Sequence, residues 1–253
     1  MKSTVLGSSA AYAGAGEACS GYLLEHGSTK LLLDCGNGIA SNLQRYMDHR
    51  DLTHVVISHM HIDHFIDLVP LHFAFWHTAT EGIPTKPHIF LPPGGRRVLE
   101  RVVSSIDKSG FFIEQVFHLE AYRPGKQYRL GDLVVEFTPT EHFVPTYAAA
   151  IYADGRKFTF SADTRPCAGL VRAAEGADLF LCEATIFDPS DAQGRQGHRT
   201  AFEAGEVART AGVQRLLLTH FWPDCDRERS CAEASSAFTG SVEFAFASLS
   251  ATL

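Results

Sequence analysis

Short apolar runs alternate with amphipathic segments along most of the chain. Apolar runs bounded by glycine, asparagine or aspartate predict strands, and we expect these at residues 4–7, 20–26, 30–34, 54–58, 111–119, 133–140, 146–153, 157–162, 178–183 and 214–219, with a short strand within 82–95. Apolar positions at helical spacing predict helices, at 39–49, from about Asp63 to Trp76, and at 96–106, 166–175, 200–211 and 227–237. Strands mixed with helices throughout indicate an α/β protein.

The two halves of the chain echo each other. The run KLLLD ends at Asp34, and a later apolar strand runs into His59. In the second half, KFTFSAD ends at Asp163 and RLLLT runs into His220. Two similar halves, about 1–125 and 126–253 of a single domain 1–253, would bring both sets of strand ends to one edge of a sandwich. The match is short, so duplication and accident both stay open.

The strongest chemical signal follows the apolar run at 54–58. His59, His61, Asp63 and His64 stand within six residues, directly after this predicted buried strand. Imidazole and carboxylate groups suit zinc and its first-row neighbours. Three ligands for one ion and a pair for another fit this spacing, whereas four ligands for a single ion would strain so short a loop. The pattern therefore predicts metal binding.

Further ligands are expected at other strand ends. His142 in PTEHFVPTY, Asp163 in FSADTRP and His220 in LLLTHFWP each follow an apolar strand. Taken singly, such a residue is more often a hydrogen-bonded polar group at the surface or in the core. Their shared position at strand ends indicates that they join the histidine motif.

The order of these residues resembles that of the metallo-β-lactamase fold hydrolases, over essentially the whole chain. The segments at 6–24, 161–166, 182–187 and 197–221 resemble the RNase Z-like, tRNA-processing branch, which also includes small bacterial cyclic-nucleotide phosphodiesterases. The resemblance implies an αββα sandwich of two mixed β-sheets flanked by helices. It also implies two zinc-type ions bridged by Asp163. One ion would take His59, His61 and His142, and the other Asp63, His64 and His220.

The implied chemistry is attack of a bridging hydroxide on a phosphodiester. Zinc is the expected metal, and manganese, iron or cobalt are compatible with the ligands. Asp63 would orient the hydroxide. His198 in GHRT is the candidate general acid, because its family counterpart lies over the site and imidazole titrates in the right range; a hydrogen bond to the phosphate is the alternative. Thr200 and Glu203 predict a helix capping box.

Departures from the tRNA-processing pattern indicate a small substrate. The nucleases insert a long arm between the ligands corresponding to His142 and Asp163, whereas residues 143–162 here predict a tight hairpin with Asp154-Gly155 at its turn. FIDLVPLHF replaces the glycine-rich continuation of the metal motif, and the net charge is −7, although polyanion binding normally recruits several basic residues. We therefore expect a small phosphodiester, with cyclic nucleotides first and tRNA disfavoured.

Three alternative functions remain open at this point. They are a tRNA 3′-processing endoribonuclease, a lactone or thioester hydrolase, and a non-catalytic metal-binding protein. Five aromatic residues near the metal motifs predict either a base-stacking wall or ordinary packing, namely Trp76, Phe143, Tyr147, Phe221 and Trp222. Six scattered cysteines without a secretory signal favour reduced thiols in the cytoplasm. No membrane association is expected, and the aromatic residues are compatible with a homodimer.

Overall fold

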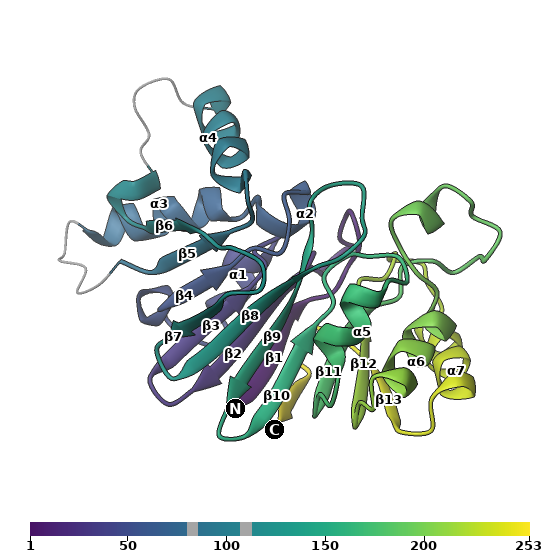
Figure 1. The fold of residues 1–253 in the computed structure, drawn as a ribbon. Helices are drawn as coiled ribbons and strands as arrows, with labels where there is room; N and C mark the ends of the chain where they lie inside the picture. The colour runs from purple at the N-terminus through teal and green to yellow at the C-terminus, as the bar shows by residue number, and fades with distance from the viewer. Residues whose placement is uncertain (80–85, 107–112) are drawn as a thin grey trace.

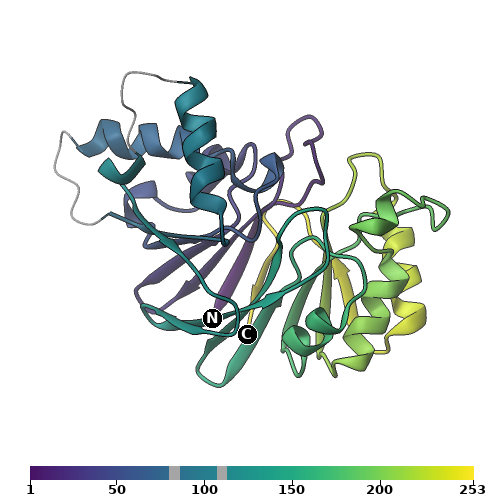
Figure 2. The ribbon, with the colours of Figure 1, turned by 45° about the horizontal axis from the view of Figure 1, so that its top comes forward.

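Two β-sheets face each other, and helices cover their outer faces, in a computed structural model that describes residues 1–79, 86–106 and 113–253 (Figures 1 and 2). One apolar core lies between the two sheets and includes Leu24, Val56, Phe137 and Leu181. The arrangement is the expected αββα sandwich. Both chain termini lie at the same end of the molecule, away from α2 (Figure 1).

Each sheet has seven strands. In spatial order, the first sheet consists of β14 (Ser250–Thr252), β1 (Lys2–Gly7), β2 (Gly21–His26), β3 (Thr29–Leu33), β4 (His54–Val56), β5 (His88–Leu91) and β6 (His118–Ala121). The second sheet consists of β13 (Ser241–Phe244), β12 (Arg215–Thr219), β11 (Leu179–Glu183), β10 (Arg156–Phe160), β9 (Tyr147–Ala153), β8 (Leu133–Pro139) and β7 (Gln127–Leu130). In each sheet the pairing changes from antiparallel to parallel partway across, at β3 and at β10.

The helices divide between the two outer faces. A second core covers the first sheet with residues of the helices α1 (Ile39–Leu43), α2 (Ile62–Phe65), α3 (Leu68–Ala79) and α4 (Gly95–Ile106). A third core covers the second sheet with residues of α5 (Ala168–Ala174), α6 (Ala201–Thr210) and α7 (Arg227–Ala237). The predicted capping box at the start of α6 is confirmed, with Thr200 and Glu203 in reciprocal contact. None of the described helices combines the length and apolar character that a bilayer-spanning segment requires.

Several predicted elements differ in extent. The strand predicted at 111–119 is wrong in its first part: residues 111 and 112 lie outside the described ranges, a short 3₁₀ helix, η2, covers Ile113–Gln115, and β6 begins only at His118. Ile113, Val116 and Phe117 are buried, and their spacing is that of a helix. Because residues beside them in the sequence are also apolar, the sequence alone does not distinguish this spacing from that of a strand. The helix predicted at 39–49 ends at Leu43, and a second 3₁₀ helix, η1, follows at His49–Asp51. The unpredicted strands β7, β13 and β14 are edge strands of only three or four residues, too short for a clear apolar pattern.

Strained backbone lies at the strand ends that form one edge of the sandwich. Asp34 (φ 56°), Ala162 (φ 52°) and His220 (φ 58°) adopt left-handed conformations without being glycine, which costs of order 1–3 kcal/mol each and is typical of functional sites. The echo between the halves holds for Asp34 and Asp163, which follow β3 and β10. The echo does not extend to the spatial order of the strands, because β4, which precedes His59, adjoins β3, whereas β11 separates β12, which precedes His220, from β10. Duplication stays a prediction.

Candidate metal centre

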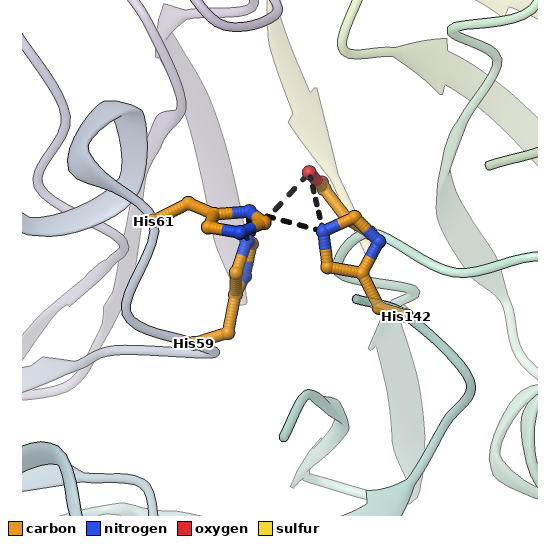
Figure 3. A group of neighbouring side chains, drawn as sticks. His59, His61 and His142 are labelled. Atoms are coloured by element: carbon orange, nitrogen blue, oxygen red, sulfur yellow. Dashed lines mark hydrogen bonds and ion pairs between the residues drawn. The ribbon is translucent and has the colours of Figure 1, made fainter. Parts of the chain in front are cut away.

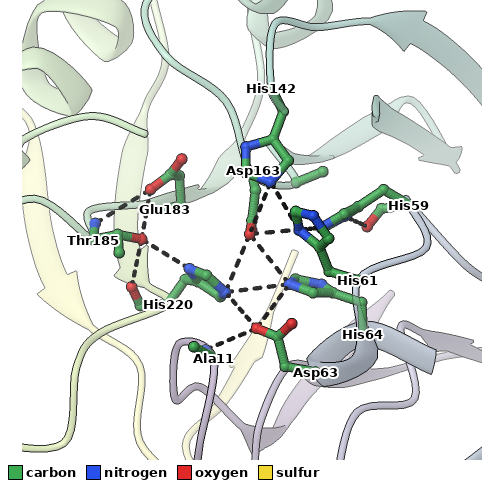
Figure 4. Close-up of polar contacts among 12 residues, drawn as sticks. Ala11, His59, His61, Asp63, His64, His142, Asp163, Glu183, Thr185 and His220 are labelled. Atoms are coloured by element: carbon green, nitrogen blue, oxygen red, sulfur yellow. Dashed lines mark hydrogen bonds and ion pairs between the residues drawn. The ribbon is translucent and has the colours of Figure 1, made fainter. Parts of the chain in front are cut away.

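The seven predicted ligands come together at this edge, from loops that follow different strands (Figure 4). The loop after β4 supplies His59 and His61, and α2 begins there and supplies Asp63 and His64. The remaining three residues follow β8, β10 and β12, and are His142, Asp163 and His220. The strand ends of both sheets therefore converge, although the two outermost ligands lie 161 positions apart in the sequence.

Three imidazoles face a common point (Figure 3). The Nδ1 of His61 lies 3.2 Å from the Nε2 of His59 and 3.0 Å from the Nε2 of His142. The Oδ2 of Asp163 completes the group, at 3.7 Å from the Nε2 of His59 and 3.9 Å from the Nε2 of His142. These four side chains form one group that could hold a metal ion.

A second group lies directly beside the first. The Nε2 atoms of His64 and His220 are 3.2 Å apart, and the Oδ2 of Asp63 lies 3.4 Å and 3.3 Å from them. The Oδ2 of Asp163 is 3.3 Å from each of the same two nitrogens. One carboxylate oxygen of Asp163 thus faces both groups, and Figure 4 shows it between them.

Four of the five histidines use their outward nitrogen, Nδ1, to contact an oxygen atom. A neutral imidazole carries a single proton, so a donating Nδ1 leaves the inward Nε2 with a lone pair. The contact also fixes the orientation of the ring, as is usual around metal ligands. The four contacts are His59 to Ser58 Oγ at 3.0 Å, His64 to Asp34 Oδ2 at 2.7 Å, His142 to Gly197 O at 2.7 Å, and His220 to Thr185 Oγ1 at 2.8 Å.

The charges of the site favour a cation. Burial lowers the pKa of His59 and that of His142, so both imidazoles are neutral at pH 7. Burial acts to raise the pKa values of Asp63 and Asp163, but the surrounding imidazoles outweigh it and hold both values low. Burial likewise opposes the charged form of His64, yet the nearby carboxylates raise its pKa well above the usual range. Ionised carboxylates therefore stand beside the neutral imidazoles of His59 and His142, and a metal that binds His64 would displace its second proton.

The distances also fit a metal. With metal–nitrogen bonds of about 2.0–2.1 Å, the edge of a coordination tetrahedron is roughly 3.3 Å, close to the 3.0–3.2 Å between the paired nitrogens. The second carboxylate oxygen of Asp163, Oδ1, is buried and has no hydrogen-bond partner among the described residues. A buried charged oxygen of this kind is costly unless a cation compensates it. The cluster is compatible with divalent metal binding.

His198 lies against both ligand groups. Its ring stacks on His220, with centroids 5.8 Å apart, and meets His142 edge to face at 4.8 Å. Its Nδ1 is 3.1 Å from the Oε1 of Glu183. Burial lowers the pKa of His198, but the Glu183 carboxylate outweighs it and raises the pKa to about 9. Because Glu183 engages Nδ1, Nε2 is the ring nitrogen that is free for a further contact.

Sequence reasoning did not assign the residues that support the ligands. Asp34 is fully buried, accepts from the Ser58 backbone and hydroxyl, and faces His64. Glu183 is also fully buried, and its Oε2 accepts a hydrogen bond from the Thr185 hydroxyl at 2.7 Å. The same hydroxyl oxygen lies 2.8 Å from the Nδ1 of His220. Both acids end or directly follow apolar strands, in KLLLD and DLFLCE. The rule that selected Asp163 would therefore have found them.

Two further contacts also hold the site. The glycine- and serine-rich loop at 7–16 presents the Ala11 N–H to the Oδ2 of Asp63 at 2.8 Å. Arg199 is fully buried and donates to the Thr164 and Arg165 carbonyls at 2.9 and 2.7 Å. This guanidinium fixes the segment that directly follows Asp163.

Asparagine in place of Asp34 should weaken metal binding about 10- to 100-fold, the usual effect of losing such a supporting contact. The asparagine amide is neutral, and only its oxygen accepts hydrogen bonds. It therefore cannot replace both carboxylate oxygens that face Ser58 and His64. Competition with a chromophoric chelator measures the affinity. Asp132→Asn, which alters a surface carboxylate bonded to Ser28, is the control. Equal affinities in the two variants would show that Asp34 does not support the metal ligands.

Comparison with known proteins identifies the class. A family model described as the beta-lactamase superfamily domain matches residues 29–221. The chain belongs to this superfamily, and at the edge where the strand ends meet it carries a cluster of histidines and aspartates that could hold metal ions.

Individual relatives cover nearly the whole chain. It is 30% identical to the probable metallo-hydrolase YhfI of Bacillus subtilis, over 97% of each chain, and 28% identical to ribonuclease Z of Myxococcus xanthus, over 97% of this chain and 95% of that one. The crystal structure of YhfI superposes with a TM-score of 0.90 over 99% of this chain and 98% of that one, at 29% identity. Human tRNase Z, short form, at 23% identity, shares the fold, with a TM-score of 0.76 over 100% and 99%. The expected metallo-β-lactamase fold and RNase Z-like relatives are confirmed.

Proposed function

We propose that this chain is a dinuclear metal-dependent phosphodiesterase that acts on small phosphodiesters, with cyclic nucleotides as the leading substrates. The position of Asp163 carries the proposal, because its Oδ2 lies 3.3–3.9 Å from four imidazole nitrogens that belong to two ligand groups. Two ions could share this oxygen. Zinc suits the nitrogen and oxygen ligands best, and manganese or iron is compatible.

The chain's own groups would complete the chemistry. When bound, a pair of divalent ions lowers the pKa of water and stabilises charge on the attacking and leaving oxygens of an in-line displacement. Asp63, held by the Ala11 N–H, would orient the attacking water. His198, kept protonated by Glu183, would give the proton on its Nε2 to the leaving alkoxide.

The surroundings of the site support a small substrate. The interval between His142 and Asp163 is a short hairpin, in which β9 and β10 pair directly and turn at Asp154-Gly155. This hairpin contains no inserted arm that could bind tRNA. The net charge of −7 also opposes binding to an extended polyanion.

A substrate panel on the metal-loaded protein tests the proposal. We expect about two ions per chain by elemental analysis, hydrolysis of bis(p-nitrophenyl) phosphate and a cyclic nucleotide, and loss of both activities on chelation with recovery after metal is returned. Precursor tRNA and an acyl-lactone complete the panel. Cleavage of the tRNA without turnover of cyclic nucleotides would favour a processing nuclease, and turnover of the lactone alone would favour an acyl hydrolase. A loaded protein inert toward all four would indicate a non-catalytic metal-binding protein.

A further inference from the structure

A cleft of about 670 Å³ opens beside the metal ligand His142. Its volume lies in the range of roughly 300–1,000 Å³ that is typical of small-molecule sites. Phe143, Pro145, Arg165 and Gln196 contribute to its lining. The cleft thus adjoins one of the two ligand groups through His142, and it mixes apolar with polar side chains, as a binding site for part of a substrate would.

Phe143 places an exposed aromatic ring beside the reacting groups. The residue is 52% exposed. Its ring centroid lies 5.0 Å from that of His142 and 6.0 Å from that of His198. A group that leaves toward His198 would therefore have this ring next to it.

The backbone of Gly197, which has no side chain, packs directly against the ring of Phe143. A Cβ atom on Gly197 would lie 2.4 Å from the Cε2 of Phe143 and 2.8 Å from the Nδ1 of His142, closer than atoms can approach. Gly197 therefore permits the loop before His198 to pack flat against both rings. An aromatic ring fixed in this way is pre-organised to bind a ligand.

The polar groups of the cleft suit a neutral partner. The Arg165 guanidinium donates to the Oε2 of Glu141 at 2.7 Å, so its charge is largely offset. Gln196 adds an amide to the lining of the cleft. Such a surface offers hydrogen bonds to hydroxyls and ring nitrogens, but it offers little excess positive charge to a second phosphate.

We propose that this cleft is a nucleoside subsite, in which Phe143 stacks the base of the group that leaves toward His198. The inference rests on the proposed phosphodiesterase activity and specifies its substrates as diesters of nucleosides, rather than aliphatic diesters or lactones. Base–aromatic stacking typically strengthens binding roughly 5- to 150-fold.

The test compares two inhibitors that differ only by the base. Adenosine 5′-monophosphate and ribose 5-phosphate compete against hydrolysis of bis(p-nitrophenyl) phosphate, by wild type and by the Phe143→Leu, Phe143→Tyr and Phe73→Leu variants. Phe73, on the outer helix α3, is 50% exposed and serves as the matched control. We expect the nucleotide to inhibit wild type at least fivefold more tightly than the sugar phosphate. Phe143→Leu should abolish this difference, whereas Phe143→Tyr and Phe73→Leu should preserve it.

The outcomes separate the two proposals. If wild type hydrolyses diesters but the preference for the nucleotide is absent, or survives in Phe143→Leu, the subsite is wrong and the phosphodiesterase proposal stands. If fully loaded wild type hydrolyses no diester, both proposals fail. Thermal melting and metal content identify a Phe143→Leu protein that has lost its fold. In that case Phe143→Trp and Phe143→Tyr, which keep an aromatic ring, must retain the preference, and its loss in both would overturn the subsite.

Discussion

Asparagine in place of Asp163 will reduce phosphodiester turnover by roughly 10³-fold or more, because a shared metal centre supplies several kcal/mol of transition-state stabilisation. The Oδ2 of Asp163 lies near both ligand groups, 3.3 Å from the nitrogens of His64 and His220 and 3.7 Å from that of His59. An amide keeps the shape of the side chain but removes the negative charge. Metal content should fall below two ions per chain, measured by elemental analysis beside the rate.

Asp178→Asn provides the matched control for this substitution. Asp178 also adjoins a strand of the second sheet, but its carboxylate pairs with Arg156 at 2.7 Å, at the start of β11 rather than at its end. This variant should keep its metals and its rate. An Asp163→Asn protein that retains two ions and the rate of wild type would refute the shared carboxylate and, with it, the dinuclear proposal.

Local patterns made most of the fold predictable, together with all seven side chains of the candidate metal cluster. Buried strands such as β3 and β11 are continuous apolar runs, and parallel strands of this kind end at one edge of a sheet. The position of a polar residue directly after such a run, at the edge of the sheet, can therefore be predicted before any tertiary contact is known. Edge strands such as β13 escaped prediction because only one of their faces meets the core, so the pattern has few apolar residues to show.

The supporting contacts join residues that lie far apart in the sequence, so no local sequence pattern predicts them. Asp34 reaches His64 across 30 positions, and the Gly197 carbonyl reaches His142 across 55. The position of Gly197 against Phe143 is likewise visible only once both loops are placed. These contacts orient the ligands and shape the cleft. The sequence thus predicts which atoms could bind metal, whereas the tertiary structure determines their orientation and what lies beside them.

Alanine in place of His198 should slow hydrolysis of a cyclic nucleotide by about 10²- to 10⁴-fold, the usual contribution of a general acid. The alkoxide that leaves in this reaction is strongly basic and needs a proton. The p-nitrophenolate that leaves from bis(p-nitrophenyl) phosphate is stable at neutral pH and needs none, so its release should slow far less. Rates of both substrates, measured at saturation on the same metal-loaded preparation, give the ratio that identifies proton donation.

Glu183→Gln should reproduce this dependence on the leaving group in weaker form, because Glu183 holds the proton on His198 through a contact of 3.1 Å. His118→Ala, which removes an exposed imidazole on β6, should change neither rate. A His198→Ala enzyme slowed equally on both substrates would assign His198 to binding the phosphate rather than to proton transfer. The two roles differ because a phosphate contact acts on both diesters alike, whereas a proton donor matters only when the departing oxygen is basic.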